Sequence, residues 1–204
     1  NAKVIPAFRA HLEVTIEFFL PNNVLAVLAL GKKALGLDPP QDANGGDSSM
    51  VLAFLRAKEK AGGIRADIVL VNCGLHDIKT DPQTGKKQVS LDDYRHNLTE
   101  ILAALCRMGV QTAWVRTTPC DERVHNRPGI PFHRFSADVI RYNEAADAVM
   151  AAAGIPVIDL YTFTANLGDS LFCDHVHFRQ EVRERQAAFI AGWIAAWAGT
   201  KGAT

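Results

Sequence analysis

Hydrophobic residues recur along the chain with two different spacings. Short apolar or alternating runs predict strands at Val14 to Phe19, Ile68 to Asn72, Thr112 to Val115 and Ile155 to Ile158. Longer segments with apolar residues three and four positions apart predict helices at Ser48 to Ala61, Leu91 to Met108, Ala137 to Ala153 and Arg179 to Trp197. Strands that alternate with helices predict an α/β fold, with helices on both faces of a mostly parallel sheet. Within Asn22 to Pro40, the segment Val24 to Leu35 fits either a helix or an added strand, and Pro39-Pro40 ends either.

Composition narrows the class of protein. The chain has 204 residues, 48% of them hydrophobic, which suits one domain spanning residues 1 to 204. Lys and Arg total 22, as do Asp and Glu, so no net charge attracts nucleic acid or an anionic membrane. The apolar stretches are too short or too interrupted to span a bilayer. We expect a soluble protein whose partner is a small molecule or a polymer end.

The cysteines and the N-terminus say less. The four cysteines form no Cys-x-x-Cys pair and favour buried thiols over a disulfide framework. No targeting signal is recognisable after Asn1, and a segment upstream could have been removed. The compartment therefore stays open, with the cytoplasm favoured.

Candidate chemistry lies in the segment Asp174-His175-Val176-His177, just before the last predicted helix. An Asp three residues before a His can accept a hydrogen bond from Nδ1 and leave Nε2 free to take a proton. Asp174 and His177 are therefore the candidate acid and base of a hydrolase triad. A helix N-terminus with incidental histidines is the alternative interpretation.

Two further blocks point to the same edge of the sheet. Cys73-Gly74-Leu75-His76-Asp77 follows a predicted strand, and Gly46-Asp47-Ser48 opens a predicted helix whose N–H groups suit a developing negative charge. The polar loops Thr80 to Ser90 and Pro119 to Pro131 also follow strands, and we expect them to line the site. A metal centre built from these His and Asp residues is a second possibility, although no ligand motif is present.

These blocks resemble those of the SGNH, or GDSL-type, hydrolase superfamily over roughly residues 44 to 195. The resemblance implies a three-layer α/β/α sandwich with a flavodoxin-like sheet, and an Asp-x-x-His block that Asp174 and His177 match. Gly74 to Asp77 matches the family's Gly-x-Asn-Asp block, except that His76 stands where Asn is usual. Further family-like segments are Thr117 to Pro119, Arg141 to Asn143 and Val157 to Leu160.

The resemblance leaves the nucleophile open between two assignments. Gly46 lies 30 residues before His76, which suits the family's oxyanion Gly better than its nucleophile block. In the first assignment, which we favour, Gly46 and His76 form the oxyanion hole, Val4 to Leu12 resembles the helix after the nucleophile, and the strand carrying the nucleophile lies upstream of Asn1 or has been lost. In the second, Ser48 is the nucleophile. No Ser or Cys precedes Ser48.

The implied activity is hydrolysis of a small ester, such as an O-acetyl group on a carbohydrate, with no metal and no cofactor. A hydroxyl attacks the carbonyl, His177 transfers its proton, and Asp174 stabilises the imidazolium. A domain of the same fold that binds ligand without a nucleophile is the remaining alternative. The sequence does not specify the oligomeric state.

Overall fold

The described part of the protein contains a parallel sheet with its strands in sequence order. The computed structural model describes residues 46–201. Within them, β1 (Ile68–Val71) pairs with β2 (Gln111–Val115), which pairs with β3 (Val157–Ile158). The register sets Val71 opposite Trp114 and Trp114 opposite Val157. These strands fall within one to two residues of the predicted ones, whereas Val14 to Phe19, Val4 to Leu12 and Asn22 to Pro40 lie outside the described residues.

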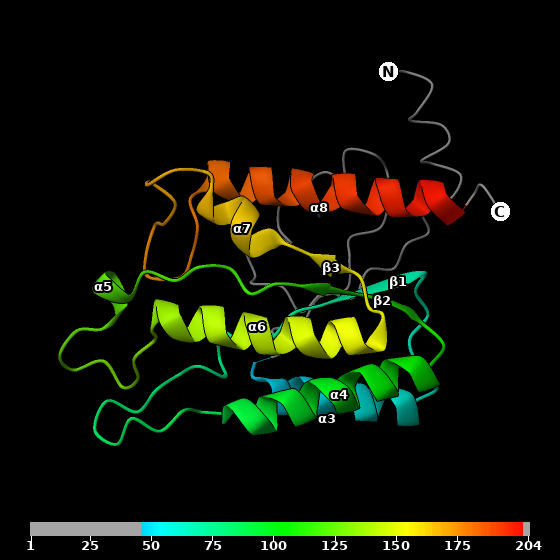
Figure 1. Ribbon diagram of the computed structural model, residues 1–204, viewed down its shortest axis with the longest axis horizontal. Coiled ribbons are helices and arrows are strands. Elements are labelled where there is room, and N and C mark those ends of the chain that lie inside the picture. The colour runs from blue at the N-terminus through cyan, green and yellow to red at the C-terminus, as the bar shows by residue number, and fades with distance from the viewer. Residues whose placement is uncertain (1–45, 202–204) are drawn as a thin grey trace.

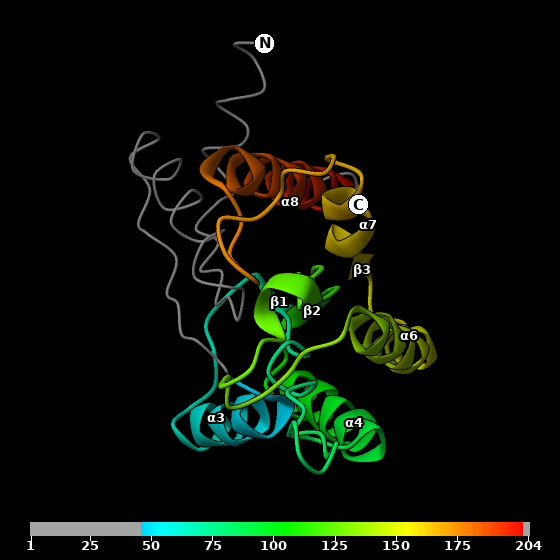
Figure 2. The same cartoon turned by 90° about the vertical axis from the view of Figure 1, so that its left-hand side faces the viewer.

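Helices cover both faces of this sheet, which confirms the predicted three-layer α/β/α arrangement. One layer holds α3 (Ser48–Lys60), α4 (Leu91–Arg107) and α6 (Ser136–Ala153), and the opposite layer holds α7 (Leu160–Ala165) and α8 (Gln180–Lys201) (Figure 2). A single-turn helix, α5 (Glu122–His125), lies in the segment after β2. The predicted bounds of the four long helices were right to within four residues. α5 and α7 were not predicted, because four and six residues are too few to show a helical period.

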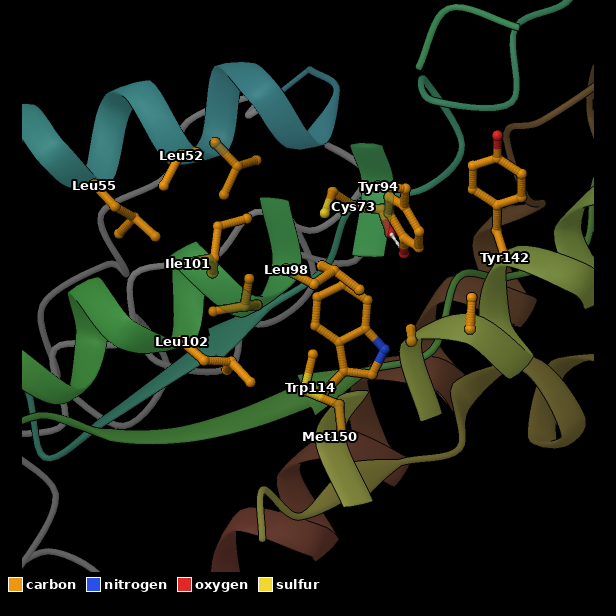
Figure 3. Close-up of a cluster of buried hydrophobic side chains, with 14 of the residues drawn as sticks. Leu52, Leu55, Cys73, Tyr94, Leu98, Ile101, Leu102, Trp114, Tyr142 and Met150 are labelled. Carbon is orange, nitrogen blue, oxygen red and sulfur yellow. Dashed lines mark hydrogen bonds between the residues drawn. The ribbon is translucent and has the colours of Figure 1, made fainter. Parts of the chain in front are cut away.

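The alternation of side chains along β1 and β2 divides the core in two. Val69, Val71 and Trp114 face α3, α4 and α6, and Trp114 is fully buried there (Figure 3). Ile68 and Leu70 point to the other face and pack against α8. Both faces of the sheet are therefore buried, which explains why these strands read as continuous apolar runs.

The carboxyl ends of the strands set the position of the loops. The segments that follow β1 and β2, together with the segment before α8, gather at one end of the molecule, at the left of Figure 1. Ligand sites of open α/β sheets form at this edge. The candidate blocks 74–77 and 174–177 both lie on these segments.

No helix of the described residues is both long enough and apolar enough to cross a bilayer.

Candidate active site

Asp174 and His177 lie on a tight turn that precedes α8. Main-chain N–H of Cys173 donates to the carbonyl oxygen of His177 at 2.8 Å, and Phe172 pairs with Phe178 as an antiparallel bridge. Asp174 Oδ1 accepts the main-chain N–H groups of Val176 and His177 at 2.8 and 2.7 Å. Asp174 Oδ2 lies 2.5 Å from His177 Nδ1. One carboxylate thus shapes the turn and orients the imidazole.

This environment fixes the charge of Asp174. Partial burial alone raises the pKa of its carboxyl group, but the hydrogen bonds from Val176 and His177 outweigh burial and lower the pKa to about 2. The His177 side chain is 48% exposed, and no residue of the described part hydrogen-bonds to its Nε2. The pair therefore presents an imidazole with an ionised carboxylate behind it and an open nitrogen in front, which is the geometry of a general base.

The block that contains His76 is held by the end of β1. Gly74 has a φ of 143°, and a Cβ there would lie 2.5 Å from Thr117 Oγ1, so the close approach of these segments requires glycine. The carbonyl oxygen of Cys73 accepts hydrogen bonds from the Tyr94 and Thr117 hydroxyls at 2.9 and 3.0 Å. The direction in which the chain leaves β1 is therefore set by buried contacts.

His76 itself is half-buried and neutral. Burial lowers the pKa of its imidazole to about 4, with Lys79 and Arg134 contributing as neighbouring positive charges. No residue in the range 46–199 hydrogen-bonds to this ring. A neutral imidazole carries one N–H donor, so His76 can supply the hydrogen bond that the family's Asn would.

Ser48 is a buried residue at the start of α3. Its side chain is completely buried at the start of α3, and Oγ accepts a hydrogen bond from Asn97 Nδ2 at 2.9 Å. Its main-chain N–H donates to both carboxylate oxygens of Asp77, at 2.9 and 3.1 Å. Asp77 thus accepts a main-chain N–H that belongs to α3. No hydrogen bond joins Ser48 and His177 in the described part of the chain.

Gly46 lies two residues before α3, with a φ of 69°. A Cβ at this position would lie 2.5 Å from Met50 Sδ. Asp47 caps the helix by accepting Met50 N–H at 3.0 Å, and Gln88 of the Thr80 to Ser90 loop donates to its second oxygen. The block 46–48 is therefore joined to the block 73–77 through Asp77. It is also joined to the Thr80 to Ser90 loop, which was predicted to line the site.

Contacts also connect the block 73–77 with the turn that carries Asp174 and His177. Arg134 Nε donates to the carbonyl oxygen of Leu75 at 2.8 Å, and Thr80 forms antiparallel bridges with Lys87 and His133. Asp121 N–H donates to the carbonyl oxygen of His175, whose ring stacks on His125 with centroids 4.2 Å apart. The loop after β2 therefore links blocks 74–77 and 174–177.

Two residues of this region were missed by the sequence analysis. Asn97 is a buried polar residue on the apolar face of α4, three positions after Tyr94, and that placement was a usable signal. Arg134 is only 4% exposed, and its sole sequence signal is that it interrupts an aromatic stretch between Phe132 and Phe135. Neither belongs to a recognisable motif.

Within residues 46–201, no group of three or more His, Cys, Asp or Glu side chains is arranged to hold a metal ion.

Comparisons with known proteins support the fold. No family model matches the chain, and no curated protein does. Among solved structures, a lipase/acylhydrolase from Enterococcus faecalis is similar at 19% identity and a TM-score of 0.68, with 90% of this chain and 96% of that chain covered. A GDSL-like lipase from Bacteroides thetaiotaomicron is similar at 17% identity and a TM-score of 0.66, with 95% and 97% covered.

An acetyl xylan esterase is similar at 12% identity and a TM-score of 0.66, with 88% of this chain and 98% of that chain covered. These solved structures therefore confirm the fold that the resemblance implied. The chain has the fold of the GDSL-type hydrolases.

Proposed function

We propose that the protein is an ester hydrolase that removes a small acyl group, such as acetyl, from an alcohol. The observation that carries this proposal is the Asp174–His177 pair, with Oδ2 and Nδ1 2.5 Å apart and the ring half exposed. The fold of known lipases, acylhydrolases and an acetyl xylan esterase supports it.

The proposed reaction is an acyl transfer in two steps. A hydroxyl attacks the ester carbonyl while His177 Nε2 takes its proton, and His177 then returns that proton to the oxygen of the leaving alcohol. Water, deprotonated by His177, then attacks the acyl-enzyme; the bond to the attacking oxygen breaks, that oxygen takes the proton back from His177, and the acid is released. Gly46 and the neutral His76 are the proposed oxyanion donors. The ionised Asp174 carboxylate stabilises the imidazolium that forms in both steps.

We assign Ser48 a structural role in this scheme. Its buried hydroxyl is bonded to Asn97, and its N–H to Asp77, so it fixes the start of α3. Within residues 46–199, no hydroxyl or thiol hydrogen-bonds to the His177 ring. We therefore propose that the attacking hydroxyl lies outside the described residues, in agreement with the spacing between Gly46 and His76.

The test is hydrolysis of p-nitrophenyl acetate. His177→Ala should abolish turnover, whereas His96→Ala, which removes an exposed imidazole from α4, should leave it unchanged and so control for surface histidines. Ser48→Ala should retain turnover in the folded fraction. A folded but inactive Ser48→Ala variant would assign the nucleophile to Ser48 instead.

Two further results would contradict the proposal. Turnover that a chelator removes would favour a metal-dependent hydrolase. No turnover and no labelling by a fluorophosphonate, with ligand binding retained, would favour a binding domain that keeps the fold without the reaction.

A further inference from the structure

The structure contains a buried arginine whose charge has no acidic partner among the described residues. Arg134 is 4% exposed, and no carboxylate of the described residues lies within salt-bridge distance of it. Arg116 shows the usual arrangement, because its guanidinium pairs with Asp147 at 3.1 Å and Asp159 at 2.9 Å. Burying a guanidinium without a counter-ion is costly, so an unpaired one calls for an explanation.

The hydrogen bonds of Arg134 leave the two terminal nitrogens of its guanidinium, the fork of the side chain, without an acceptor among the described residues. Nε donates to the carbonyl oxygen of Leu75 at 2.8 Å, and the guanidinium carbon lies 4.9 Å from the centre of the Phe132 ring. Neither terminal nitrogen has an acceptor among residues 46–199, and both keep some contact with solvent. Two parallel N–H donors in this state match the geometry of a carboxylate.

Other donors surround the same place. Lys79 Nζ lies 4.8 Å from the centre of the Phe132 ring, and the half-buried His76 is adjacent to Leu75, the anchor of Arg134. We call His76, Lys79, Phe132 and Arg134 the Arg134 cluster. Its positive charge acts on His76, His125 and His175, each of which has its pKa lowered in part by Arg134. The cluster therefore contains the proposed oxyanion donor His76, and the charge of Arg134 also reaches His175 on the turn that carries Asp174 and His177.

We propose that the Arg134 cluster binds a carboxylate on the alcohol part of the substrate, so that the protein acts on acyl esters of acidic alcohols such as hydroxy acids or acidic sugars. The inference rests on the proposed function for the ester and for the small acyl group, which leaves the alcohol part to carry the charge. The carboxylate would supply the missing counter-ion, and Arg134 would orient the ester beside His76.

The kinetic test compares 4-acetoxybenzoate with its neutral methyl ester. The wild type should prefer the acid by about 10- to 100-fold in kcat/KM, the range expected for a charge-assisted hydrogen-bonded pair. Arg134→Gln should remove that preference. Arg127→Gln removes an exposed charge from the same loop and should preserve it. A wild-type ratio near one, or an equal loss in both variants, overturns the substrate assignment.

A binding test separates this inference from the proposed function. Benzoate should bind the wild type and Arg127→Gln more tightly than benzamide does, as followed by NMR of the histidine rings, and this preference should disappear in Arg134→Gln. If Arg134→Gln does not fold, Arg134→Lys keeps the charge without the fork and should bind benzoate more weakly than the wild type. Equal binding of benzoate and benzamide to the wild type overturns the anion site, whether or not any ester is turned over. If no ester is hydrolysed while benzoate is preferred, the proposed function fails and the anion site stands.

Discussion

Asp77 holds the start of α3 in place, because both of its carboxylate oxygens accept the main-chain N–H of Ser48, 29 positions away in sequence. The carboxyl group is completely buried, and Ser48 is equally inaccessible. The contact makes the helix start and the turn after β1 a single rigid unit. It fixes the relative placement of the two segments that carry Gly46 and His76.

The first prediction concerns the acid Asp77. Burial raises its pKa from 3.8 to about 6, although the hydrogen bonds from Ser48 oppose this rise. The native state therefore holds the proton longer than the unfolded state, so the stabilisation is complete below 3.8 and is lost as pH rises through about 6. The free energy of unfolding should fall by about 3 kcal/mol over that interval, and Asp77→Asn should lack the fall. Urea denaturation at a series of pH values measures it, and parallel curves for the two proteins contradict it.

The second prediction concerns the role of His76 as a donor. His76→Ala should lower kcat by about 10²- to 10³-fold, whereas His76→Asn, which restores one N–H donor, should keep most of the activity. Because the pKa of His76 is about 4, its ring is already neutral across the neutral pH range. The acid limb of the rate profile should therefore be the same in the wild type and in His76→Asn. A shifted limb would show that His76 titrates during catalysis.

The third prediction separates two functions of Asp174. Asp174→Asn can still accept the N–H groups of Val176 and His177, so the melting temperature should change little. Its amide cannot stabilise the imidazolium, and kcat should fall by about 10⁴-fold. Asp174→Ala should lose the turn as well and melt at a lower temperature. Equal melting temperatures for the two variants would mean that the turn does not depend on Oδ1.

The fourth prediction tests the close approach of Gly74 to Thr117. Gly74→Ala combines an unfavourable positive φ with a Cβ 2.5 Å from Thr117 Oγ1. Gly129→Ala is the matched control, because its φ is 85° and no atom lies within 4 Å of the added Cβ. The φ alone costs about 1–3 kcal/mol, and the collision should add about 1–3 kcal/mol. Thermal unfolding should show the larger loss for Gly74→Ala, and equal losses would mean that the segments separate easily.

The fifth prediction concerns the two hydroxyl groups that share the Cys73 carbonyl oxygen. Tyr94→Phe or Thr117→Val should each lower the free energy of unfolding by about 0.5–1.5 kcal/mol, because the other hydroxyl still satisfies the oxygen. The double variant leaves that oxygen unpaired and should lose about 1–3 kcal/mol beyond the sum. Additive losses in a double-mutant cycle would argue against shared acceptance.

Most of the fold could be predicted from the spacing of apolar residues along the longer elements. The helix predicted from Leu91 to Met108 differs from the observed helix by only one residue at its end. The prediction was accurate because Leu98, Ile101 and Leu105 form an apolar face that is buried in the core. The strand predicted from Ile155 begins later, at Val157. Here the N–H of Ile155 donates back to the carbonyl oxygen of Met150, so the end of α6 uses a group that a strand would need.

The site was only partly predictable. Asp174 and His177 are near neighbours in sequence, so their spacing predicted a local contact. The role of Arg134 depends on a bond to Leu75, 59 positions away, and the path of the loop after β2 determines whether that bond forms. The burial of Ser48 likewise depends on Asn97, which approaches from another helix. Such contacts follow from the packing of whole elements, and no local pattern encodes them.

The side chain of Arg134 donates a hydrogen bond to the main-chain carbonyl of Leu75. The main chain of Arg134 is held by the Asn126 side-chain amide, which donates to the Arg134 carbonyl and accepts the Arg134 N–H. The bond to position 75 does not depend on the side chain there, since every amino acid has the same main-chain carbonyl. A substitution of Leu75 should therefore leave this anchor of the Arg134 guanidinium intact.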